Sequence, residues 1–334
     1  MKVAINGLGR IGRQVLRRIQ GTPGLELVAV NDLGELAGLA HLVQYDSLHG
    51  RAGFPVGHED GCLLLDQTPV PCFREPDPLR LPFAQLGAQL VLECTGACTD
   101  RAWAARHLQA GVPRVLIGGP VPDADLTVVP GVNEHRLGPQ PPAVLAAGCA
   151  TTQALALLLR VLDLAFGVRA ALATAVESYG NDQRILDLPH PDLRMARAAA
   201  ASMIPAPSGA AASLDRILPH LAGRMDVQAI RVPTPDVGLV DLSVTLERDA
   251  TPAALLAAFR AAAQAPPLAG LLEVLEAPLV SSDLRGGTAS CVLDALLTKV
   301  MTPRFVKVFG WFDNEVAYAA RLVDLCLRLK GIPS

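Results

Sequence analysis

The stretch that decides the fold is KVAINGLGRIG, residues 2–12. Its first five residues are an apolar run that predicts a buried strand, and the residues after it repeat apolar side chains at helical spacing. Between strand and helix, three glycines have the G-x-G-x-x-G spacing: Gly7, Gly9 and Gly12. Glycines at these places permit a tight turn and let a pyrophosphate approach the helix N-terminus, so the stretch predicts a dinucleotide-binding turn.

A second apolar strand, residues 25–31, ends at Asp32, twenty residues after Gly12. Strand, glycines, helix, strand and carboxylate in this order are a much stronger signal than the glycines alone. A carboxylate at this place accepts hydrogen bonds from the adenosine ribose and repels a 2′-phosphate. The expected cofactor is therefore NAD rather than NADP.

Further apolar runs alternate with helical stretches up to residue 148, as in a doubly wound parallel sheet. These runs cover residues 90–94, 114–117 and 126–129. Ligands of such sheets bind at the carboxyl ends of the strands. Thr95, Gly96 and Gly118 directly follow two of the runs and are therefore candidates for cofactor contacts.

The segment AGCATTQ, residues 147–153, places Cys149 between an apolar strand, residues 142–147, and a long apolar helix, residues 153–166. A thiol at a helix N-terminus faces free N–H groups and the positive end of the helix dipole, which stabilise a thiolate and a developing oxyanion. Cys149 is therefore a candidate nucleophile. Many free cysteines only pack in a core, and this segment alone leaves that interpretation open.

After Cys149 the pattern changes to that of a second domain. Apolar and polar side chains alternate over residues 240–246, as in a strand with one face in a core, and residues 170–176 and 304–310 also predict strands. The fold class is therefore α/β. We expect a Rossmann NAD-binding domain over residues 1–148, an α+β catalytic domain over residues 149–313, and a C-terminal helix within residues 314–334 that packs back on the first domain.

The composition gives no reason to expect a nucleic acid or membrane partner. Of the 334 residues, 51% are hydrophobic and 18% are charged, and the formal net charge is −3 without a basic run. The first residues show no signal peptide, and the seven cysteines have neither a C-x-x-C pair nor a Cys/His ligand spacing. We therefore expect a cytoplasmic protein with reduced thiols and no metal site.

Together the motifs make the chain resemble the phosphorylating glyceraldehyde-3-phosphate dehydrogenase family, which includes the erythrose-4-phosphate dehydrogenases. The resemblance extends along nearly the whole length. It implies the fold expected above, with a glyceraldehyde-3-phosphate dehydrogenase-type catalytic domain. The matching strings are VAINGLGRIGR at 3–13, NDL at 31–33, AHL and YDS within 40–47, NDQRILDLPH at 181–190, IRVPTP at 230–235 and WFDNEV at 311–316.

The resemblance implies an NAD-dependent oxidation of a small-molecule aldehyde by a homotetramer. Cys149 would form a thiohemiacetal and then, after hydride transfer to the nicotinamide, a thioester. Arg10 and Ile11 would lie on the pyrophosphate, Asp32 on the ribose and Asn314 on the nicotinamide amide.

On the same basis, Arg231 and Asp182 would help to hold the terminal phosphate of the substrate, and Thr151 belongs to the expected substrate site. Ser208 and Gly209 keep the phosphate-cradling character of the Thr-Gly pair that the family has there. Arg231 also fits a structural ion pair, and that alternative stays open.

The chain departs from the family at the catalytic base, because Glu177 in the string VESY stands where the family has a histidine. Two like charges about 4 Å apart at an effective dielectric near 20 repel by roughly 4 kcal/mol, whereas a helix terminus returns only about 0.3–1 kcal/mol. Cys149 and Glu177 are therefore expected to titrate as a coupled pair, in which Glu177 acts as a general base.

A second departure concerns the inorganic-phosphate site. Gly148, Ala150 and Met195 stand where the family usually has a serine, a threonine and an arginine. The family's threonine is also missing at Gly180, and Thr152 replaces an asparagine. These changes favour a thioester that is hydrolysed rather than phosphorylated. The alternatives are an ordinary phosphorylating enzyme, an erythrose-4-phosphate dehydrogenase, and a non-catalytic NAD-binding paralogue.

Overall fold

The computed structural model describes residues 1–330 and divides the chain into two compact units. The first unit contains Met1–Val128, Glu134–Gly148 and the chain from Tyr318 onward, and the second contains Val129–Asn133 and Cys149–Ala317. This division differs from the expected boundaries in two short segments, 129–133 and 314–317, which it groups with the second unit. For the first of these the reason is packing, because Val129 and Val132 are buried in the hydrophobic core of the second unit.

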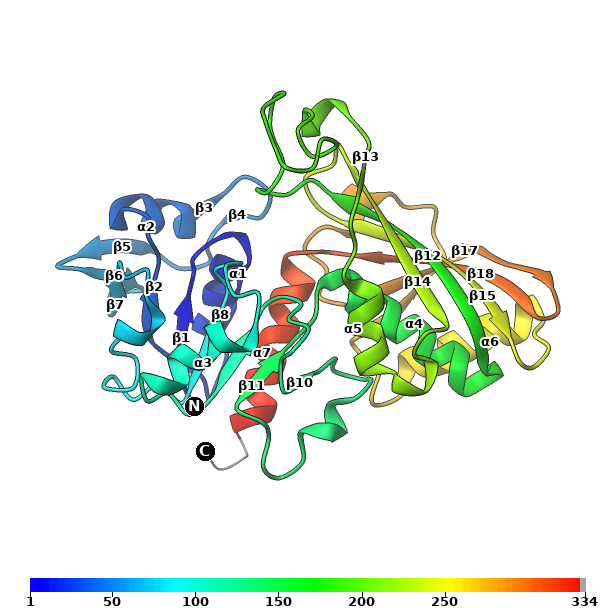
Figure 1. The fold of residues 1–334 in the computed structure, drawn as a ribbon, viewed down its shortest axis with the longest axis horizontal. Helices are drawn as coiled ribbons and strands as arrows, with labels where there is room; N and C mark the ends of the chain where they lie inside the picture. Colours follow the sequence, from blue (N-terminus) through cyan, green and yellow to red (C-terminus); the bar gives the residue numbers. More distant parts are fainter. Residues whose placement is uncertain (331–334) are drawn as a thin grey trace. The chain divides into compact units, whose positions relative to one another are not determined.

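A nine-stranded sheet forms the centre of the first unit, in the order β10-β11-β9-β8-β1-β2-β7-β6-β5 (Figure 1). The strands from β10 to β7 in this order are parallel, and β6 and β5 continue the sheet as antiparallel strands. The strands are β1 (Lys2–Asn6), β2 (Glu26–Asn31), β5 (Val56–Glu59), β6 (Cys62–Leu65), β7 (Thr68–Phe73), β8 (Leu90–Glu93), β9 (Val115–Ile117), β10 (Leu126–Thr127) and β11 (Val144–Ala146), and a separate ribbon pairs β3 (Tyr45–Asp46) with β4 (Gly50–Arg51).

The order of the strands creates a switch point beside β1. From β1 the chain continues to β2 on one side, whereas β8 pairs with β1 on the other side. The carboxyl ends of these three strands, Asn6, Asn31 and Glu93, therefore meet at one edge of the sheet. In doubly wound sheets this edge is the place where ligands bind.

Four helices belong wholly or mainly to the first unit: α1 (Arg10–Gln20), α2 (Leu36–Gln44), α3 (Arg101–Gln109) and α7 (Val316–Lys330). Helix α1 buries Val15, Leu16 and Ile19 and packs against β1 and β2. Helix α7 buries Ala319, Val323, Cys326 and Leu329, and Leu322 of the same helix lies beside Gly118.

The second unit is built on a mixed seven-stranded sheet, in the order β13-β14-β12-β15-β18-β17-β16. The pairs β12·β14 and β16·β17 are parallel, and the other neighbours are antiparallel. The strands are β12 (Val168–Ser178), β13 (Ile204–Ala206), β14 (Met225–Val232), β15 (Gly238–Leu246), β16 (Leu272–Leu275), β17 (Cys291–Thr302) and β18 (Phe305–Phe312).

Three helices cover one face of this sheet: α4 (Ala150–Phe166), α5 (Ala210–Ile217) and α6 (Pro252–Gln264) (Figure 1). Helix α4 is buried along most of its length and packs on four strands. It begins three residues earlier than the sequence pattern predicts, because the Cys149 sulfur accepts a hydrogen bond from the Thr152 amide and so caps the first turn.

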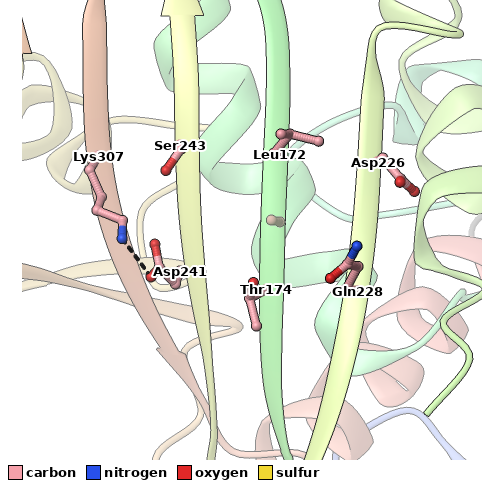
Figure 2. A pocket seen from close by; sticks show the side chains of 8 residues that line it. Leu172, Thr174, Asp226, Gln228, Asp241, Ser243 and Lys307 are labelled. Carbon is pink, nitrogen blue, oxygen red and sulfur yellow. Dashed lines mark ion pairs between the residues drawn. The ribbon is translucent and has the colours of Figure 1, made fainter. Parts of the chain in front are cut away.

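The opposite face of the sheet carries polar side chains and one large exposed leucine (Figure 2). Lys307 on β18 forms an ion pair of 2.7 Å with Asp241 on β15, and Leu172 on β12 is 67% exposed. A pocket of about 220 Å³ on this face is lined by Leu172, Ala173, Thr174, Asp226, Gln228, Asp241, Ser243 and Lys307.

The two sheets confirm the predicted fold class, a doubly wound NAD-binding unit followed by an α+β unit. The sequence pattern did not predict β5, β6 and β7, which extend the first sheet, or β13, β14, β16 and β17 of the second. Within residues 1–330, no helix combines the length and the apolar character that crossing a bilayer requires.

Candidate active site

The three glycines of the turn between β1 and α1 have different surroundings, and each favours the absence of a side chain. Gly7 has a φ of +95°, and a Cβ on it would lie 2.6 Å from the Thr95 amide nitrogen. A Cβ on Gly12 would clash with the Gly7 carbonyl. Around Gly9, the N-cap residue of α1, no described atom apart from its neighbours along the chain lies within 4 Å of the Cβ position. This open side lets a pyrophosphate reach the first N–H groups of the helix.

Arg10 and Ile11 form the first turn of α1, as the pyrophosphate assignment requires. The Arg10 side chain, however, is held by the Asp46 carboxylate at 2.6 and 3.1 Å. Burial raises the pKa of Asp46, but hydrogen bonds from the Leu48 amide and from Arg10 outweigh it and hold the pKa below its ordinary value. The groups that this turn offers to an anion are therefore the backbone N–H groups of Arg10 and Ile11.

Asp32 follows β2 at the same edge of the sheet. Its Oδ2 accepts a hydrogen bond from the Leu8 amide at 2.7 Å, and its Oδ1 accepts one from the Gly34 amide at 2.8 Å. A carboxylate oxygen has two lone pairs, so both oxygens can still accept from the ribose hydroxyls. The first turn and Asp32 thus fit the pyrophosphate and the ribose of NAD.

Thr95 and Gly96 follow β8, and Gly118 follows β9, at this edge. The Thr95 hydroxyl donates to the Glu93 carboxylate and accepts from the Ala97 amide at 3.1 Å. Since the hydroxyl has these partners, Thr95 would meet a cofactor with its backbone. The Gly118 amide donates to the Glu93 carbonyl at 2.9 Å, which ties the two strand ends together.

Cys149 is partly exposed at the N-terminus of α4. Its sulfur lies 3.1 Å from the Thr152 hydroxyl and 3.4 Å from the Thr152 amide. Burial raises the pKa of Cys149, hydrogen bonds with Thr152 and Thr151 lower it, and the negative charge of Glu177 raises it. The net pKa is above the ordinary value, so Cys149 is a thiol at neutral pH.

Glu177 and Arg231 are register partners at the ends of the parallel strands β12 and β14. Glu177 Oε1 accepts from the Thr151 hydroxyl at 2.5 Å, and Glu177 Oε2 lies 3.4 Å from Arg231 Nε. Arg231 Nη1 donates to the Ser178 carbonyl at 2.9 Å. Because the Thr151 hydroxyl also contacts Cys149, it connects the carboxylate with the thiol.

Arg231 forms an ion pair with Glu177, which is the alternative role that the sequence left open for it. The Arg231 Nε contact with Glu177 is electrostatic rather than an aligned hydrogen bond, since this nitrogen is buried and meets no hydrogen-bond geometry within the described chain. The Glu177 side chain is 16% exposed, so its charge is only weakly screened by water.

Asn314 is fixed by two donors. The Ser178 hydroxyl lies 3.2 Å from Asn314 Oδ1, and the Val237 amide donates to the same oxygen at 3.1 Å. The other terminal atom, Nδ2, is therefore the one that would donate to a carboxamide oxygen. This orientation fits the nicotinamide role expected for Asn314.

The residues expected at the substrate phosphate lie in two places in the second unit. A Cβ on Gly180 would clash with the Asp182 carboxylate and would lie 3.9 Å from Arg231 Nη1, so Asp182 and Arg231 both approach this glycine. Ser208 and Gly209 precede α5, and the Ser208 hydroxyl accepts from the first amide of that helix at 3.3 Å.

The three residues that replace the expected phosphate ligands offer no cation or hydroxyl. Gly148 has a φ of +66°, a conformation in which other residues are strained, and its carbonyl accepts a 2.7 Å hydrogen bond from Tyr318. Ala150 begins α4. Met195 is 6% exposed, so it is a buried apolar side chain.

Three further side chains shape these sites, and the sequence analysis did not assign them a role: Asp46 under Arg10, Glu93 under Thr95, and Ser178 against Asn314. Ser178 follows Glu177 at the end of β12, and Glu93 ends β8 two residues before Thr95. Their place beside predicted site residues is the feature of the sequence that points to them. The sequence singles out Thr152 only as the replacement of an asparagine, although it stands three residues after Cys149, which is the spacing of an N-cap contact.

Comparison with known proteins agrees with this geometry. The model of the glyceraldehyde 3-phosphate dehydrogenase NAD binding domain matches residues 1–101, and the model of the C-terminal domain matches residues 148–314. Glyceraldehyde-3-phosphate dehydrogenase of Geobacillus stearothermophilus is 45% identical over 334 residues, with 99% of each chain covered. The corresponding enzymes of Bacillus subtilis and Streptomyces coelicolor are 44% and 43% identical, with 99% and 97% of each chain covered.

These matches confirm the predictions of an NAD cofactor and of an NAD-dependent dehydrogenase. They leave the Glu177 substitution and the fate of the thioester as predictions. The chain belongs to the glyceraldehyde-3-phosphate dehydrogenase family.

Proposed function

We propose that the protein oxidises a phosphorylated sugar aldehyde with NAD through a thioester on Cys149, and that water rather than inorganic phosphate releases the product. The class of aldehyde follows the relatives, whose names specify glyceraldehyde 3-phosphate. The observation that carries the proposal is the Glu177 carboxylate, which Thr151 and Arg231 hold beside the thiol.

The carboxylate can serve twice as a general base. As the Cys149 sulfur attacks the aldehyde carbon, Glu177 takes the thiol proton, and a thiohemiacetal forms. NAD, when bound, accepts the hydride from this carbon, which leaves an acyl group on the sulfur. The protonated Glu177 gives this first proton to the solvent and is then free to take a proton from the water that attacks the thioester. As the acid leaves, Glu177 returns that second proton to the Cys149 sulfur, which restores the thiol. In sum, aldehyde, NAD and water give carboxylic acid, NADH and a proton.

Phosphate is a poor acceptor at this site. Gly148, Ala150 and Met195 supply no hydroxyl or positive charge where the resemblance places the attacking phosphate. Hydrogen bonds to charged groups contribute about 1.5–3 kcal/mol each, so the loss of two would weaken phosphate binding by roughly two to four orders of magnitude. An anion that enters beside Glu177 also meets a like charge. Water requires no such ligands.

The substrate phosphate has a different set of candidate ligands. Asp182 and Arg231 both approach Gly180, and Ser208 and Gly209 lie at the start of α5. Arg231 also pairs with Glu177, so one guanidinium would serve both the substrate phosphate and the catalytic carboxylate. Binding of substrate would then compete for the partner of Glu177 and make this carboxylate a stronger base.

The test is NADH formation from glyceraldehyde 3-phosphate and from erythrose 4-phosphate, each with and without inorganic phosphate. We expect a rate that does not change with phosphate, and phosphorus NMR should show the phosphorylated carboxylic acid as the product, without an acyl phosphate signal. A Cys149→Ser variant is the control for thioester chemistry.

A requirement for millimolar phosphate together with release of an acyl phosphate would contradict the proposal and identify an ordinary phosphorylating enzyme. Tight NAD binding without turnover of either aldehyde would identify a non-catalytic paralogue instead.

A further inference from the structure

A chain of buried polar side chains crosses the cofactor edge of the first sheet. Asn31 Nδ2 donates to Asn6 Oδ1 at 2.7 Å, and Asn6 Nδ2 donates to Glu93 Oε2 at 2.6 Å. His107 Nε2 on α3 lies 3.0 Å from the same Glu93 oxygen. All four residues are at most 3% exposed, so solvent does not compete for these hydrogen bonds.

The backbone at Glu75 fixes which atoms donate and which accept along this row of hydrogen-bonded side chains. The Glu75 amide donates to Asn31 Oδ1 at 2.9 Å, and the Glu75 carbonyl accepts from Asn31 Nδ2 at 3.0 Å. Because a backbone N–H can only donate, the Asn31 side chain cannot be flipped, and Asn6 is then oriented by Asn31. A nitrogen, and not an oxygen, therefore faces Glu93.

At the other end Glu93 meets only donors. Its Oε1 accepts from the Thr95 amide at 2.9 Å and from the Thr95 hydroxyl, while Oε2 accepts from Asn6 and His107. An ionised carboxylate can accept all four, whereas an amide cannot. Because a carboxylate oxygen can only accept, the contact with Glu93 makes His107 Nε2 the donor. The His107 ring is stacked on Phe83, with ring centroids 6.3 Å apart and planes 9° apart.

The two bonds to Thr95 set the backbone of the turn after β8. The Thr95 hydroxyl, held by Glu93, accepts from the Ala97 amide, and Gly96 between them has a φ of +74°. The Thr95 amide also lies against Gly7, where there is no room for a Cβ. The turn therefore has the carboxylate beneath it and the first glycine beside it.

We propose that Glu93 is a positioning residue for the nicotinamide half of NAD. In a doubly wound sheet the cofactor extends across the switch point, and Asp32 after β2 holds its adenosine half. Strand β8 lies on the other side of β1, so the turn at Thr95 and Gly96 faces the nicotinamide half. The buried row of side chains holds the ends of β2 and β8 in the conformation that binds the cofactor. Binding then loses less conformational entropy.

The decisive variant is Glu93→Gln, which keeps the shape of the side chain but turns one of its acceptors into a donor facing Asn6 and His107. We expect the Kd for NAD, measured by calorimetry, to rise roughly ten- to hundredfold. The Kd for AMP, a probe of the adenosine half, should stay within about threefold of wild type. In turnover, KM for NAD should rise much more than kcat falls.

Leu92→Val is the matched control, because Leu92 is fully buried in the same strand and takes no part in the polar chain. It should lower the melting temperature and leave both affinities unchanged. A second pair keeps the proposal testable if Glu93→Gln does not fold: Thr95→Val should weaken NAD binding, and Thr95→Ser, which keeps the hydroxyl, should restore it.

A Glu93→Gln protein that melts at lower temperature but binds NAD as wild type does would overturn the proposal. Equal weakening of NAD and AMP would overturn it as well, because that result describes a general loss of structure. So would a Thr95→Val variant with unchanged NAD affinity. The proposal rests on NAD binding alone and does not depend on the fate of the thioester.

Discussion

The reactivity of Cys149 is set by burial and by neighbouring side chains with opposite effects on its pKa. The Glu177 charge disfavours the thiolate, and two like charges about 4 Å apart at an effective dielectric near 20 repel by roughly 4 kcal/mol. Arg231 offsets part of this charge, and Thr152 stabilises the thiolate through its hydroxyl and amide. Burial together with Glu177 outweighs these contributions, so the pKa of Cys149 remains above its ordinary value.

We predict slow alkylation of Cys149 at neutral pH. The thiolate is the reactive form, and a raised pKa means that its fraction increases only as the pH rises past the ordinary cysteine value of about 8.5. Glu177→Gln removes the like charge, lowers the pKa and should make iodoacetamide labelling at pH 7 roughly tenfold faster or more. Labelling against pH, followed on the Cys149 peptide by mass spectrometry, measures the effect.

The control for this experiment is Glu276→Gln, the same chemical change at an exposed glutamate that pairs with Arg260. It should leave the labelling rate of Cys149 unchanged. A labelling midpoint below about pH 6 in the wild-type protein would show that the thiolate is stabilised at rest, and the argument from like charges would then be wrong.

At the scale of elements, both sites form where a strand ends and the chain turns toward a helix. The turn after β1 exposes the first N–H groups of α1, and Cys149 occupies the cap of α4 after β11. The carboxyl end of β2 adds Asp32, whose oxygens are already oriented by two backbone amides. We therefore expect the choice between NAD and NADP to depend on the end of this one strand.

We predict that NAD binds much more tightly than NADP. A 2′-phosphate would stand against the Asp32 carboxylate, and repulsion of about 1–4 kcal/mol corresponds to a preference of roughly ten- to thousandfold. Asp32→Asn should reduce this preference, while Asp249→Asn, the same change at an exposed residue paired with Arg304, should not. Calorimetric titration with both nucleotides decides the matter, and equal affinities in the wild type would remove Asp32 from this role.

At the scale of the whole molecule, the second unit exposes several large apolar side chains. Leu172 and Phe305 are 67% and 43% exposed on the open face of its sheet. In the segment between β12 and β13, Ile185 and Leu193 are 84% and 81% exposed. Monomers rarely expose large contiguous apolar patches, so we propose that these surfaces meet other copies of the chain in a homotetramer.

We predict that Leu172→Asp shifts the assembly toward smaller species. A charge placed in an interface loses hydration without gaining a partner, which should weaken association by more than about tenfold. Leu164→Asp is the matched control, because Leu164 is 68% exposed but lies on α4, on the helix side of the sheet. Sedimentation velocity measures the species, and a wild-type chain that sediments as a monomer would contradict the proposal.

The sequence alone determined the features that depend on neighbours along the chain. The glycine turn, the strand to Asp32 and the place of Cys149 between a strand and a helix each lie within a few residues or one βαβ unit, so spacing and residue type are enough to predict them. The same holds for the C-terminal helix, which the sequence predicts within residues 314–334 and the structure places at residues 316–330.

The tertiary structure decided the contacts that join distant parts of the chain. Glu177 meets Arg231 because β12 and β14 pair in parallel in one particular register, and no local pattern specifies that register. Glu93 receives hydrogen bonds from Asn6 and His107 because β1 pairs with β8 and α3 packs on the neighbouring strand β9, although the sequence shows these only as separate polar residues. Local spacing determines turns and caps, whereas the charge and orientation of a buried group depend on the elements that pack around it.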